Sequence, residues 1–122
     1  MAKYVNDSVM DAGLANVSSN ANQIHVCATE PTTRTEAVTT NQLASGTIAS
    51  GDFTLANGDT SGRKHTVGAQ TALTIDNSGS GDHIAITSAT ALLVVTTCAA
   101  QALTAGGTVD ISAFEHEIAD AA

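Results

Sequence analysis

Apolar side chains follow a helical period at the start of the chain, within residues 5–20. The positions are Val5, Val9, Leu14 and Val17, with Met10 beside them. Side chains spaced three or four residues apart along a helix fall toward one face, so the recurring apolar positions predict an amphipathic helix. Asn6 or Asp7 can cap its first turn, while Gly13 weakens it.

A helix this short is marginal in water on its own, so its apolar stripe must lie against a sheet or a neighbouring subunit. We expect the second arrangement. Residues 1–21 then form a helical arm ahead of a β domain of residues 22–122, and Val5, Val9, Leu14 and Val17 are candidate interface residues.

From Gln23 onward the apolar pattern changes to the short, alternating runs of β-strands. The predicted strands are residues 24–28, 47–49, 53–55, 63–67, 72–75, 83–87, 92–97 and 109–118, the last with a possible bulge. Residues 31–46 and 99–107 are predicted as loops, and residues 57–62 and 77–81 as turns. Closely spaced short strands predict a mainly β fold, an antiparallel β-sandwich or jelly-roll-like barrel with a short N-terminal helix.

The charge and the aromatic content of the chain disfavour several classes of binding partner. The chain has 122 residues, 4 Lys and Arg against 12 Asp and Glu, and a net charge of −8. An acidic surface disfavours nucleic acid and anionic membranes as partners. Aromatic residues make up 2% of the chain, fewer than most carbohydrate sites and base-stacking platforms need. The first residues lack the apolar stretch of a secretory signal, and no apolar run approaches the length that spans a bilayer.

One segment has the spacing of a calcium-binding loop. In residues 76–82 oxygen-bearing side chains alternate and Gly81 occupies the sixth position, but Thr87 stands where a bidentate glutamate is needed. A Gly/Ser hairpin turn explains the segment better. His25 and His83 lie in apolar strands, where histidines usually form satisfied core contacts. We therefore expect no metal, no cofactor and, in the absence of any catalytic motif, no enzymatic activity.

Two further features, the two cysteines and a pair of adjacent cations, can be explained without a functional site. Cys27 and Cys98 are expected to remain reduced thiols, because no export signal precedes them. Arg63 and Lys64 are two of the four cations of the chain, and they adjoin His65. They are candidate interface residues for docking onto an acidic surface, or they belong to a solvated strand edge that resists pairing.

The order of segments over residues 22–120 is similar to that of a known group of proteins. A strand with histidine, aliphatic residues and alanine, residues 83–86, precedes an aliphatic strand at 92–97. A leucine, glycine and Thr-Val pattern at 103–109 and a closing strand at 111–118 follow, and residues 26–33 match the opening strand and loop. This order resembles small structural proteins encoded in the virion gene clusters of tailed bacteriophages.

The resemblance implies a virion protein that is assembled in the bacterial cytoplasm. The first of the two functions that we consider is that of a head decoration (cement) protein, which binds the outer face of the major capsid protein lattice as a homo-trimer. The alternative is a tail- or fibre-associated protein that joins other virion parts or contacts the host. The scarcity of aromatic residues counts against a receptor-binding tip.

Overall fold

The computed structural model describes residues 6–59 and 61–118. The helix α1 spans Asp7–Asn20. Asn6 is its N-cap, and the Asn6 side-chain oxygen accepts a hydrogen bond of 2.8 Å from the Ser8 backbone N–H. The helix ends at Ala21, whose backbone turns to an extended conformation while its N–H still donates to Val17.

The described residues form nine strands. They are β1 (Gln23–Cys27), β2 (Gln42–Thr47), β3 (Phe53–Asn57), β4 (Arg63–Val67), β5 (Gln70–Ile75), β6 (Gly79–Thr87), β7 (Leu92–Leu103), β8 (Thr108–Ile111) and β9 (Phe114–Ile118). A π-helical turn at Glu36–Thr40 follows β1, and a 3₁₀ turn at Ser50–Asp52 precedes β3.

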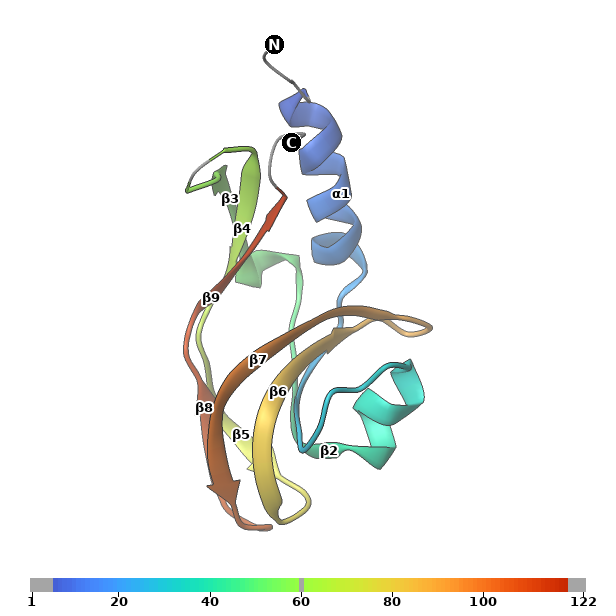
Figure 1. Cartoon of the computed structure of the whole chain (residues 1–122), viewed down its shortest axis with the longest axis vertical. Helices are drawn as coiled ribbons and strands as arrows, with labels where there is room; N and C mark the ends of the chain where they lie inside the picture. Colours follow the sequence, from blue (N-terminus) through green and yellow to red (C-terminus); the bar gives the residue numbers. More distant parts are fainter. Residues whose placement is uncertain (1–5, 60, 119–122) are drawn as a thin grey trace.

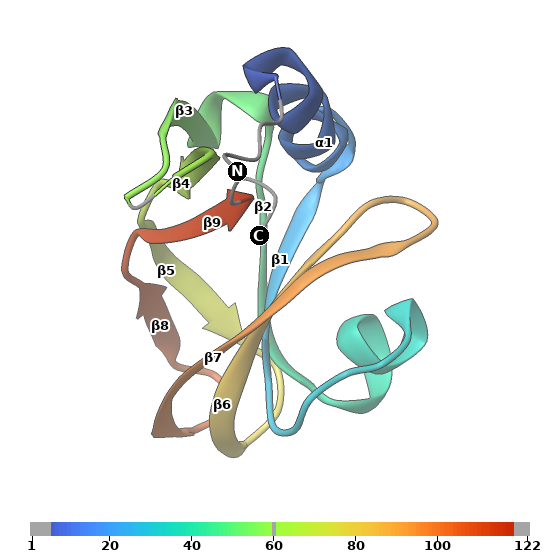
Figure 2. The ribbon, with the colours of Figure 1, turned by 45° about the horizontal axis from the view of Figure 1, so that its top comes forward.

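The strands make two sheets, in which every pair is antiparallel. The larger sheet has the order β7-β6-β1-β2-β5-β8, and the smaller has the order β3-β4-β9. The larger sheet curls so that β7 and β8, its two edges, approach one another without pairing, which makes a half-barrel (Figures 1 and 2). The predicted mainly β fold with one short N-terminal helix is thus confirmed.

The core fills the concave face of the half-barrel. Ile24, Val26, Ile84 and Ile86 come from the neighbouring strands β1 and β6, where Ile24 pairs with Ile86 and Val26 with Ile84. A smaller apolar cluster lies on the other face, where Cys27, Ala37 and Ala85 are buried under the π-helical turn. The central strands are therefore covered on both faces.

Three predicted irregular segments are regular in the structure. Residues 31–46, predicted as one loop, contain the π-helical turn and the start of β2, which pairs with both β1 and β5. Residues 79–81 and 99–103, predicted as turn and loop, extend β6 and β7 and pair with each other. Gly81 suits the strand because a Cβ there would lie 2.6 Å from Val26 Cγ1. Cross-strand packing outweighs the turn preference of Gly and Ser and the low strand preference of Ala.

Candidate functional site

The apolar stripe of α1 faces the protein's own sheets. Met10, Leu14 and Val17 are buried, and Val17 and Ala21 belong to the same core as the strands. Val9 is 62% exposed, and Val5 lies outside the described residues. With about 100° between successive helical residues, Met10, Leu14 and Val17 share one face, whereas Val9 points away from it.

The expected division into an arm and a separate β domain is corrected by this packing. Of the two surfaces that could cover the stripe, the structure provides the sheet of the same chain. At Gly13 a Cβ would lie 3.1 Å from Ile118 Cδ1, so the helix approaches β9 closely. Leu14 and Val17 are consequently covered within the chain, and only Val9 of the four candidate residues is described as exposed.

Arg63 and Lys64 lie on β4, which is the central strand of the smaller sheet and not an edge. Arg63 Nε donates to Asp11 Oδ1 of α1 at 2.8 Å. Lys64 Nζ, on the opposite face, contacts Asp59 Oδ1 at 2.6 Å and Glu115 Oε1 at 2.8 Å. Hydrogen bonds to these two carboxylates raise the pKa of Lys64. Both cations thus have carboxylate partners within the chain, which weakens the case for docking onto an acidic surface.

A histidine pair lies beneath the helix, with His65 buried and His116 partly buried. His65 on β4 faces His116 on β9, and His116 Nδ1 lies 3.3 Å from His65 Nε2. The Phe53 ring stacks at a tilt on His65 with centroids 4.9 Å apart. Burial, and then the neighbouring imidazole of His116, lower the pKa of His65 to about 4, and burial also lowers the pKa of His116. Within the described residues, His65 Nδ1 is buried without a hydrogen-bond partner.

Sequence reasoning did not find this pair. Adjacent residues of a strand point to opposite faces, so Glu115 and Glu117 point away from His116, and Glu115 contacts Lys64 on the other face. The contact between His65 and His116 depends on the register of β4 and β9, strands separated by some fifty residues. No local spacing in the sequence encodes that register.

The remaining two histidines have partners that explain them. His25 Nδ1 lies 2.7 Å from Gln42 Oε1, and its Nε2 lies 3.0 Å from Thr87 Oγ1. Burial lowers the pKa of His25, so the neutral ring donates to Gln42 and accepts from Thr87. His83 contacts the Asp82 carboxylate at 2.7 Å. The prediction of a satisfied core histidine is confirmed for His25.

The calcium-like segment does not gather its oxygen ligands. Asp76 accepts a hydrogen bond from Gln42, while Asp82 contacts His83. Gly79, Ser80 and Gly81, which lie between them, belong to β6. Over residues 6–59 and 61–118, no three His, Cys, Asp or Glu side chains are grouped as metal ligands.

The two cysteines lie on opposite faces of the larger sheet. Cys27 belongs to the cluster under the π-helical turn, whereas Cys98 packs on the concave face. They are not bonded to each other. Burial, with a smaller effect of Asp82, raises the pKa of Cys27 to about 11 and raises that of Cys98. Both are therefore protonated, weakly nucleophilic thiols at neutral pH.

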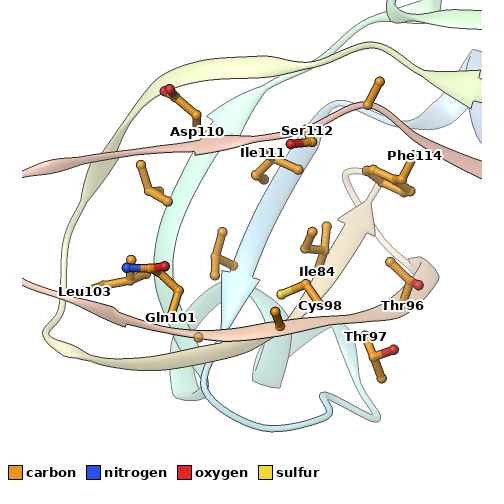
Figure 3. Close-up of a pocket in the computed structure, with 15 residues that line it drawn as sticks. Ile84, Thr96, Thr97, Cys98, Gln101, Leu103, Asp110, Ile111, Ser112 and Phe114 are labelled. Atoms are coloured by element: carbon orange, nitrogen blue, oxygen red, sulfur yellow. The ribbon is translucent and has the colours of Figure 1, made fainter.

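A hollow of about 360 Å³ lies between the edges β7 and β8 (Figure 3). Apolar side chains from five strands line it: Val26, Ile84, Leu103, Val109, Ile111 and Phe114. Of its titratable lining residues, Cys98 carries a neutral thiol, and Asp110 points away and accepts a hydrogen bond of 2.8 Å from the Ala72 backbone N–H. That bond holds Ala72 in a left-handed conformation, at the irregularity between β5 and β8. The hollow can hold an apolar group, but these residues offer no charged acid or base to it.

Comparisons of the chain with protein families, with curated proteins and with solved structures find no match. In the part of the chain that the structure describes, α1 is too short and too polar to cross a bilayer. The geometry of the chain itself therefore has to support any functional conclusion.

Proposed function

We propose that this protein is a structural subunit of a tailed-bacteriophage virion, bound as a decoration protein to the outer surface of the major capsid protein lattice. The observation that supports this best is the unpaired edge of β7, a strand of 12 residues with no charged side chain. Such an edge presents unpaired backbone donors and acceptors, so it suits assembly with other polypeptides.

The rest of the surface agrees with a role in contacts between subunits. Charged residues are 13% of the chain, about half the usual share, and the described Arg63 and Lys64 are neutralised internally. Uncharged contact surfaces reduce the repulsion between copies that each carry a net charge of −8.

The experiment is reconstitution on particles. Purified protein is added to phage heads that were assembled without it, and binding is measured by cosedimentation. The proposal predicts saturable binding and greater resistance of the filled heads to heating. A tail- or fibre-associated subunit, the alternative that the resemblance leaves open, would leave heads bare but bind purified tails. Binding to neither would contradict a virion role.

A further inference from the structure

The strand β7 combines two properties that rarely occur together. Its first half is apolar on both faces: Leu93 and Val94 pack against the main core, while Leu92 and Val95 pack against the cluster under the π-helical turn. Strands with apolar residues on both faces are usually central strands with a neighbour on each side. β7 nevertheless lies at the edge of its sheet, and these four side chains remain partly exposed. β7 therefore has the sequence typical of a central strand, but it lies at the edge of the sheet.

The other three edges of the described sheets are protected. β8 carries Asp110 among four residues, and β9 carries Glu115 and Glu117 among five. β3 has only five residues. Charges and short length are the devices that prevent edge-to-edge pairing of sheets. β7 has 12 residues without a charge or a proline, so it lacks both devices.

The absence of charged side chains on the β7 edge indicates which kind of partner it can pair with. Copies of a chain with a net charge of −8 repel one another, and contact is least costly where no charge is present. An uncharged edge gives no electrostatic advantage to a basic partner, whereas it brings no like charges together when two copies meet. One strand edge can also serve both sides of a symmetric contact, so a second copy needs no other surface.

We propose that β7 pairs with β7 of a second copy of this chain, antiparallel, so that the larger sheet continues from one copy into the next. The pairing satisfies the backbone groups of the outer edge and covers Leu92–Val95, which the chain by itself leaves half-exposed. The inference rests on the proposed function and assigns the β7 edge to contact between copies, so contact with the capsid lattice falls to other surfaces. It gives a two-fold pair in place of the expected homo-trimer, and it can be tested on the isolated protein.

The test is a glutamate placed on the edge. Thr97 is exposed on β7 and borders the hollow, and its side chain points outward from it (Figure 3). Thr97→Glu adds a negative charge at the contact of each copy, twice per pair. Thr54→Glu is the matched control, because Thr54 is exposed on the edge strand β3 and the change in net charge is the same. Circular dichroism checks that each variant is folded, and Ala99→Glu, also at an exposed position of β7, replaces Thr97→Glu if the latter does not fold.

Sedimentation velocity across a range of concentrations gives the result. We expect the wild type and Thr54→Glu to self-associate alike, and the dissociation constant of Thr97→Glu to rise by about tenfold or more. A monomeric wild type, or equal effects of the two substitutions, would overturn the proposal. Self-association through β7 in a protein that binds no phage particle would refute the virion role while leaving this inference intact.

Discussion

The buried His65, which faces the partly buried His116, makes the stability of the fold depend on pH. The folded protein holds His65 neutral, with its pKa lowered to about 4 from 6.5 by burial and by His116. The unfolded chain takes up a proton near pH 6.5, so between pH 6.5 and 4 it binds more protons than the folded chain. The free energy of unfolding is therefore fully retained above pH 6.5 and falls as the pH is lowered toward 4.

The size of this effect follows from the two pKa values. At about 1.4 kcal/mol for each pKa unit, the whole difference amounts to roughly 3 kcal/mol. Between pH 7 and pH 4.5 the wild type should lose about 2 kcal/mol through His65 alone. That is a large fraction of the stability of a small domain.

The substitution His65→Leu removes the titrating ring and keeps an apolar side chain against Phe53. It gives up the contact of 3.3 Å with His116, but it also removes the buried Nδ1 that lacks a partner. We therefore expect stability at pH 7 to change by about 1 kcal/mol or less. Denaturant unfolding of both proteins at pH 7 and pH 4.5 measures the two losses.

The variant should lose about 2 kcal/mol less than the wild type over this range. Thr66→Leu is the control, because residue 66 is next on β4, faces the other way and does not titrate. Equal losses for His65→Leu and the wild type would refute the reasoning that the fold holds this ring neutral.

Three more predictions concern packing and thiols. Leu14 is fully buried and Val9 is 62% exposed, so Leu14→Ala should cost about 2–5 kcal/mol and Val9→Ala about 0.5 kcal/mol or less in denaturant unfolding. Gly81→Ala places a Cβ 2.6 Å from a valine methyl group and should cost about 1–3 kcal/mol, whereas Gly51→Ala meets nothing within 4 Å; thermal melts compare the two. Alkylation of the denatured, unreduced protein should modify both cysteines, as measured by mass spectrometry. If neither cysteine is modified, the two are paired in a disulfide.

The sequence predicted those parts of the fold that local patterns determine. The strand at residues 63–67 has the expected position, and Asn6, one of the two residues expected to cap the helix, is the N-cap, because strand and capping preferences operate over a few residues. The face of α1 was assigned incorrectly, because Val9 has a helical spacing from Val5 but lies beside the stripe that Met10 begins. Only the position of the sheet decides which of two overlapping stripes is buried.

The β7 edge and the surroundings of Lys64 depend on contacts between distant parts of the chain, and these contacts were not predictable from the sequence. The full length of β7 follows from its pairing with residues 79–81, which were expected to form a turn. Its place at the edge of the sheet follows from the order of the strands, which no local pattern contains. The neutralisation of Lys64 requires Asp59 and Glu115 from both sides of β4.

The central claim is that the chain is a subunit of a virion. The most direct test is quantitative mass spectrometry of purified particles produced by the genome that encodes the chain, with the major capsid protein as the internal standard. A decoration protein is predicted to be present in hundreds of copies per particle, in a fixed ratio to the capsid protein. Absence from the particles, with the chain found only in the soluble lysate, would contradict the account.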